Sequence, residues 1–237
     1  MRCYFRCFVT CAVIAFGNGA CASDEDSFVS SNLISVFYHE LGHAVIDSMQ
    51  LPIFGQEKDA ADVFSILLID ELFEPESANM IVYDVAFGFH AESEQNAPVF
   101  WDVHGPDEQR YYNLVCIFYG AQPELREDLT HELGLPEERA ISCQEEYELA
   151  FDSWGGVLQE MESGTGKLRL NYQSTVPMNS IIRQEIERFN KIFGFRSDVE
   201  VAMKTCGEAN AYYDPAQASI TICNEFVAHL RMLFQNL

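Results

Sequence analysis

Apolar residues recur every three or four positions along the first two thirds of the chain, which is typical of amphipathic helices. The clearest run covers residues 33–49 and ends before Pro52 and Gly55. We expect the polar stretch 23–31 to be frayed and residues 92–98 to form a loop. Further helices are predicted over residues 57–72, 78–90, 110–120 and 137–158.

The spacing of apolar residues changes after residue 163. Alternating apolar and polar residues over 168–173 and 199–203 predict half-buried strands, and residues 211–213 and 219–222 predict two more, joined across Asp214 and Pro215. Helical spacing returns over residues 181–193 and 225–234. Helices followed by a small, mainly antiparallel sheet predict an α+β fold over residues 23–237, with a sub-domain break near 163–167 as an alternative.

The first 22 residues have the pattern of an export signal. Arg2 and Arg6 precede an apolar run over residues 8–16, and Ala20-Cys21-Ala22 matches the small-x-small cleavage pattern. The run is shorter than the about 20 apolar residues that span a bilayer. We expect cleavage after residue 22 and a periplasmic or secreted chain without a transmembrane segment. A lipid anchor at Cys21 and a buried N-terminal helix are the alternatives.

The charge of the chain excludes one class of partner. It has 14 Lys and Arg against 37 Asp and Glu, a formal net charge of −23 at pH 7. Proteins that bind nucleic acid or anionic lipid present positive surfaces to the phosphates. Nucleic-acid binding is therefore excluded as the function.

Four of the eight cysteines lie after the predicted export signal. No CxxC spacing occurs, so a zinc ribbon is unsupported. In an oxidising compartment we expect disulfides Cys116–Cys143 and Cys206–Cys223, because each pair brackets one local segment. Four free thiols are the alternative in the cytosol.

The strongest chemical signal is the motif His39-Glu40-Leu41-Gly42-His43, inside the helix predicted over residues 33–49. Side chains four residues apart share one face of a helix, so two imidazoles can bind one zinc ion. Glu40 is then placed to take a proton from a metal-bound water molecule, which becomes the nucleophile. The similar segment 131–135 ends in Leu135 instead of a second histidine, and we assign it no function.

Zinc in such a site needs a third protein ligand, with one position left open for water. The acidic residues Glu57, Asp59 and Asp62 begin 14 residues after His43, beyond the predicted turn. One carboxylate can complete the site while another orients an imidazole from outside the coordination sphere. The alternative is that these acids only favour a helix N-terminus.

These segments resemble a known family. Residues 39–44, 51–52 and 55–62 are similar to bacterial zinc metallopeptidases named for a domain of unknown function, and that family is similar to the gluzincin branch of zincins. The resemblance implies a zincin-like fold, one zinc ion and hydrolysis of a peptide or protein substrate. Further matching positions cover most of the chain: 101–104, 108–113, Cys116, 119–120, 135–139, Cys143, Trp154, 206–215 and Cys223.

One position departs from the gluzincin pattern. Gluzincins often carry a Glu four residues before an Asp, and anchoring on Ala61-Asp62 places that Glu at Lys58. A protonated lysine has no lone pair to donate and repels a cation. We therefore assign Glu57 as the third ligand because of its reach, with Asp59 as the alternative ligand and Asp62 orienting an imidazole.

Two further features concern the substrate. His104, in the aromatic stretch 100–104, is a candidate hydrogen-bond donor to the oxyanion, with Tyr111 or Tyr112 as alternatives. His104 is otherwise a structural histidine that bonds to Asp102 or to the backbone. The resemblance implies that substrate adds as a strand to a sheet edge, for which residues 210–213 and 219–222 are candidates. A purely structural hairpin is the alternative.

The sequence thus predicts an exported zinc-dependent peptidase with Glu40 as general base. The main alternative, motivated by Lys58, is a catalytically silent exported binding protein that keeps zinc for structure. A metal-free secreted interaction module is the second alternative.

Overall fold

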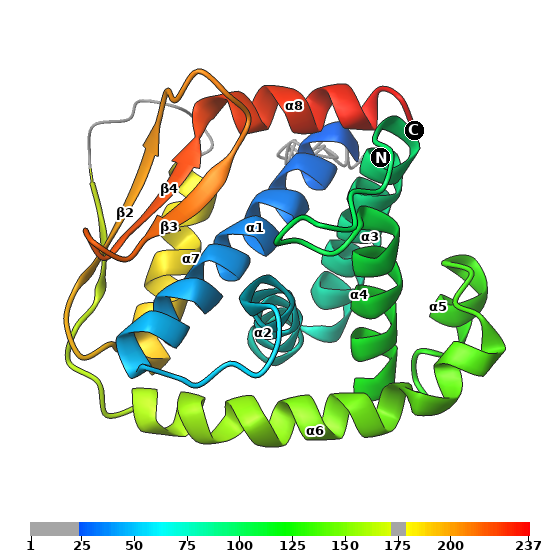
Figure 1. Ribbon diagram of the computed structural model, residues 1–237, viewed down its shortest axis with the longest axis horizontal. Coiled ribbons are helices and arrows are strands. Elements are labelled where there is room, and N and C mark those ends of the chain that lie inside the picture. The colour runs from blue at the N-terminus through cyan, green and yellow to red at the C-terminus, as the bar shows by residue number, and fades with distance from the viewer. Residues whose placement is uncertain (1–23, 172–178) are drawn as a thin grey trace, which may run out of the picture.

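The computed structural model describes residues 24–171 and 179–237 (Figure 1). The predicted export signal and the Cys21 anchor lie outside the described residues, as does the end of the strand expected over 168–173. The helices are α1 (Asp24–Met49), α2 (Glu57–Leu72), α3 (Pro75–Gln95), α4 (Asp107–Ala121), α5 (Glu127–Glu132), α6 (Glu137–Met161), α7 (Asn179–Ile192) and α8 (Asn224–Phe234). The strands are β1 (Leu168–Leu170), β2 (Val199–Lys204), β3 (Ala211–Asp214) and β4 (Ser219–Cys223).

Helix α1 crosses the middle of the molecule, between the sheet on one side and α3 and α4 on the other (Figure 1). Residues 37–46 of this helix are buried without a break. The helix begins at Asp24, so the prediction of a frayed stretch over 23–31 is wrong for its described part. Phe28 and Val29 are fully buried there, and Arg231 of α8 pairs with Glu25 and Asp26.

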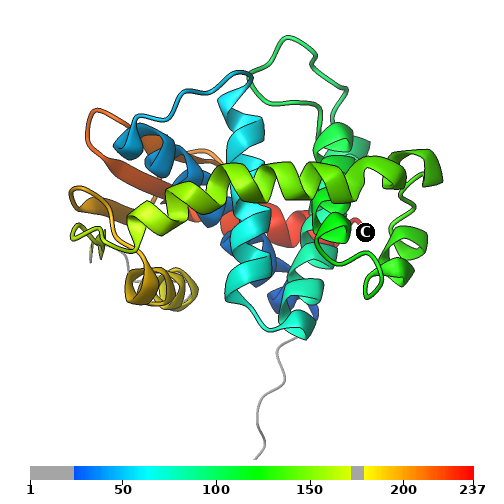
Figure 2. The same ribbon diagram turned by 90° about the horizontal axis from the view of Figure 1, so that it is seen from below.

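Helices α2, α3, α7 and α8 pack against α1. Helix α2 has the bounds that the sequence predicts, whereas α3 runs to Gln95, so the loop predicted from residue 92 begins later. Helix α5 was not predicted, because it is short and only Leu129 of its six residues is buried. Helix α6 packs across α4 and α2 (Figure 2).

The sheet is small and mixed, with the strand order β1-β2-β4-β3. β1 pairs with β2, and β2 with β4, in parallel; only β3 and β4 are antiparallel. The α+β class is confirmed, but the expectation of mainly antiparallel pairing is wrong. Helix α7 connects β1 to β2, and such a crossover returns the chain in the same direction. β3 is left at the sheet edge next to α1.

Both expected disulfides are present. Cys116–Cys143 joins α4 to α6, and Cys206–Cys223 joins the β2–β3 connection to the end of β4. Buried apolar residues of the helices and the sheet form one continuous cluster. Within residues 24–171 and 179–237, no helix is long and apolar enough to cross a membrane.

Candidate metal centre

The two motif histidines face each other inside the molecule. His39, Glu40 and His43 lie in the buried half of α1, each less than 10% exposed. The Nε2 atoms of His39 and His43 are 3.3 Å apart. Two ligands at 2.0–2.1 Å from a tetrahedral ion are separated by about 3.4 Å, so this spacing fits one zinc ion.

Each imidazole is oriented by a carboxylate on its other nitrogen. Nδ1 of His39 lies 2.6 Å from Oδ1 of Asp62, and Nδ1 of His43 lies 2.6 Å from Oε1 of Glu57. A carboxylate favours the tautomer that carries its proton on Nδ1. Both Nε2 atoms are then unprotonated, and their lone pairs repel one another unless a cation lies between them. The donor set therefore fits a divalent metal ion.

A close helix contact brings these carboxylates to α1. Gly42 packs against α2 so closely that a Cβ there would lie 3.0 Å from Cα of Ala61. The separation of two helices depends on the side chains at their contact. The glycine inside the motif thus sets the distance from which Asp62 and Glu57 reach the rings.

Asp62 is held in turn by Arg110 of α4, which the sequence analysis did not single out. Nε and Nη2 of Arg110 donate to the two oxygens of Asp62 at 2.8 and 3.0 Å, and the guanidinium lies over the ring of Phe89. Burial alone would raise the pKa of Asp62, but Arg110 and His39 hold it well below its usual value. Asp62 therefore stays ionised.

The carboxylate of Glu40 is buried next to His39, and one of its oxygens has no hydrogen-bond partner among the described residues. Its Oε1 lies 4.0 Å from Nε2 of His39, and its Oε2 is buried with no hydrogen-bond partner among the described residues. A buried carboxylate oxygen without a partner is costly. A water molecule or an ion at the two Nε2 atoms would supply the missing contact.

No third protein ligand lies at the two nitrogens. In the described part of the chain, no His, Cys, Asp or Glu donor is within 4.8 Å of both Nε2 atoms. The structure places Glu57 on Nδ1 of His43 instead, and Asp59 beside Gly105 of the α3–α4 loop. The role of Glu57 or Asp59 as a ligand stays a prediction.

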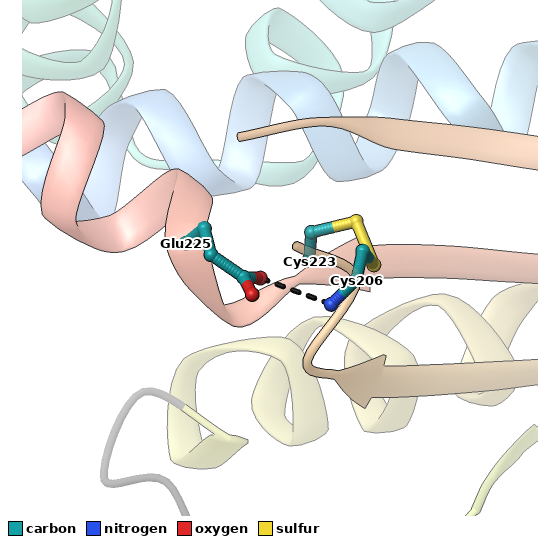
Figure 3. A group of neighbouring side chains, drawn as sticks. All are labelled: Cys206, Cys223 and Glu225. Atoms are coloured by element: carbon teal, nitrogen blue, oxygen red, sulfur yellow. Dashed lines mark hydrogen bonds between the residues drawn. A yellow bond between two sulfur atoms is a disulfide. The ribbon is translucent and has the colours of Figure 1, made fainter. Parts of the chain in front are cut away.

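One other cluster has the spacing of a metal site. Cys206, Cys223 and Glu225 lie together at the end of β4 (Figure 3). Both sulfurs are in the disulfide, and the Glu225 carboxylate accepts hydrogen bonds from the backbone N–H groups of Cys206 and Gly207. This cluster closes a loop and offers no thiolate to a metal.

Two basic side chains approach the histidines. Lys58 is half-buried, and its charge lowers the pKa of His43, although burial is the larger cause. The ring of His104 stacks on His39 with centroids 5.9 Å apart. Burial, with the charges of Arg110 and Lys58, lowers the pKa of His104 to about 4. His104 is therefore neutral at pH 7.

Comparison with protein families accounts for nearly the whole chain. The model of the DUF4344 family, whose description is "Putative metallopeptidase", matches residues 7–158 and 165–237. The chain belongs to this metallopeptidase family. Comparison with curated proteins and with solved structures finds no match. Family membership and the paired histidines point to the same kind of centre.

Two cavities flank the His39–His43 segment. One, of about 210 Å³, is lined by His39, Glu40 and His104 together with apolar residues of α8. The other, of about 500 Å³, is lined by His43, Lys58 and both tyrosines of β3. β3 borders both, because Ala211 lines the first cavity and Tyr212 the second. The edge strand therefore runs past both sides of the histidine pair.

Proposed function

We propose that this chain is an exported, zinc-dependent peptidase. The observation that carries the proposal is the pair of Nε2 atoms 3.3 Å apart, each on a ring that a carboxylate orients. His39 and His43 would hold one zinc ion through these atoms. Membership of a metallopeptidase family supports the reaction class, and the two disulfides support an oxidising, exported location.

Glu40 serves as the general base in this proposal. A bound zinc ion would lower the pKa of a water molecule towards about 7 and polarise the scissile carbonyl. Oε2 of Glu40, buried without a partner among the described residues, would be placed to take a proton from such a water molecule and to return it to the leaving amine.

The substrate would lie along β3. A peptide paired with this edge strand passes both cavities, so its backbone reaches the histidine pair in an extended form. His104, which is neutral at pH 7, can donate an N–H to the oxyanion that forms on the attacked carbonyl. Tyr213, whose hydroxyl donates to Asp47 at 2.8 Å, fixes β3 to α1 at this point.

The test is Glu40→Gln, which keeps the shape of the side chain and removes its basicity. We expect cleavage of a mixed peptide library to fall about a hundredfold or more, while the protein keeps the zinc content of the parent chain. Mass spectrometry of the products and elemental analysis measure the two quantities.

A matched control lies in the same chain. Glu132 occupies the corresponding place in the segment 131–135, on the surface and away from α1, and Glu132→Gln should leave cleavage unchanged. Undiminished cleavage in Glu40→Gln would refute the role of general base.

A second candidate function is a catalytically silent zinc protein that binds an exported partner. The observation that favours it is Lys58 beside a histidine pair with no third donor among the described residues. Zinc retained at one equivalent by the parent chain, with no peptide cleaved, would support this alternative.

A further inference from the structure

Lys58 lines the same cavity as Glu40 and His43 of the proposed metal centre. Lys58 and Asp62 are four residues apart on α2, so they occupy the same face of the helix. Asp62 on that face reaches Nδ1 of His39, while Lys58 lines the 500 Å³ cavity together with Glu40 and His43.

We propose that Lys58 keeps the affinity of this centre for zinc low, so that the chain exchanges its metal instead of retaining it. This inference rests on the proposed function, because it takes His39 and His43 as the metal ligands. It assigns Lys58 control over how much of the protein carries the ion.

The donor count supports a weak site. Among the described residues, no third His, Cys, Asp or Glu donor joins the two imidazoles at their Nε2 atoms. Glu57 is the nearest carboxylate of α2 to His43, and it is engaged at Nδ1. Moving Glu57 to the Nε2 side would release the hydrogen bond that orients the ring. Structural zinc sites use four protein ligands, and catalytic ones three.

The positive charge of Lys58 should lower the affinity for zinc further, beyond the effect of the missing third donor. Lys58 has no hydrogen bond or ion pair to any residue whose placement is described, and its side chain is half-buried. Glu40, Asp47 and Glu57 line the same cavity, but none of them forms an ion pair with Lys58. The lysine charge therefore opposes the entry of a second cation, and partial burial limits the screening by solvent. The same position with a carboxylate would offer both a donor and the opposite charge.

The experiment measures zinc affinity directly. Zinc is titrated into the oxidised chain in competition with a chromophoric chelator, for the parent and for Lys58→Glu and Lys58→Gln. We expect Lys58→Glu to bind zinc about a hundredfold more tightly than the parent, because it adds a ligand and reverses a charge. Lys58→Gln, which only removes the charge, should gain about tenfold at most.

Three controls make every outcome decisive. Lys191→Glu makes the same charge change on the exposed surface of α7 and should leave the affinity unchanged. His43→Ala in the Lys58→Glu background should abolish the gain; if it does not, the proposed metal centre is wrong. If Lys58→Glu binds no more tightly than the parent, and Glu57→Gln removes zinc from the parent, then Glu57 is the third ligand. The inference on Lys58 is then overturned while the proposed function stands.

Discussion

At the scale of single residues, the candidate metal centre depends on a series of contacts that begins outside the segment His39–His43. Arg110 fixes Asp62, Asp62 orients His39, and His39 meets His43 at the point where an ion fits. The contacts of Asp62 with Arg110 and with His39 are hydrogen bonds to a charged group, the stronger class of hydrogen bond. Replacement of Arg110 should therefore disturb both Asp62 and the orientation of the His39 ring.

Arg110→Met should destabilise the protein by about 3–5 kcal/mol. The substitution keeps a long side chain over Phe89 but leaves the Asp62 carboxylate without its buried partner. Chemical denaturation monitored by circular dichroism measures the free energy of unfolding. The matched control is Arg169→Met, which breaks an exposed pair with Asp198 and should cost less than about 1 kcal/mol. Equal losses in the two variants would contradict the role given to Arg110.

The sequence predicts the histidine pair and not its support, for a physical reason. His39 and His43 are one helical turn apart, so their spacing along the chain determines their proximity. Asp62 and Arg110 are separated by 48 residues, and only the packing of α2 on α4 brings them together. The available signal was weak: a single arginine at the start of an apolar helix in a chain with few basic residues.

At the scale of elements, the close approach of α6 to α4 is set by Gly120. A Cβ at this position would lie 2.1 Å from the carbonyl oxygen of Cys143, a distance that backbone atoms do not permit. The Cys116–Cys143 disulfide holds the two helices together, so they cannot separate to make room. The glycine is therefore required by packing and not by a turn.

Gly120→Ala should destabilise the protein by about 1–3 kcal/mol, as overpacking of a rigid contact does. Gly156→Ala on exposed α6, where nothing lies within 4 Å of the added Cβ, should stabilise it by about 0.5–1 kcal/mol. Thermal unfolding of both variants distinguishes the cases by the sign of the change. A stabilised Gly120→Ala would show that the helices can move apart.

Element boundaries were predictable where one local signal dominates. The apolar spacing of α2 and the turn residues before it give both of its ends. The parallel pairing of β1, β2 and β4 was not predictable, because pairing depends on which distant strands meet, and alternation within a strand is the same in both directions. The start of α1 was missed because Phe28 and Val29 are buried by α3 and α8, far along the chain.

At the scale of the whole molecule, two disulfides tie the layers together. Cys116–Cys143 spans 27 residues and Cys206–Cys223 spans 17, so each restricts the unfolded chain. The formal charge of −23 acts in the opposite direction, because like charges repel in the compact state. The covalent links thus offset part of the repulsion that the acidic surface brings.

Replacement of either cysteine pair by serine should lower the free energy of unfolding by about 3–4 kcal/mol. Urea denaturation of each double variant, with and without reducing agent, measures the loss. Reducing agent should destabilise the parent. It should not change the stability of a variant that lacks both disulfides. An unchanged midpoint in the reduced parent would show that the disulfides do not constrain the unfolded state.

The burial of α1 has a consequence for the shape of the site when no metal ion is bound. The helix that presents the two imidazoles is also the central helix, against which α2, α3, α7, α8 and the sheet pack. Its shape is maintained by those neighbours, whether or not an ion is present. If the proposed zinc ion leaves, the site should keep its shape and should bind another ion without refolding.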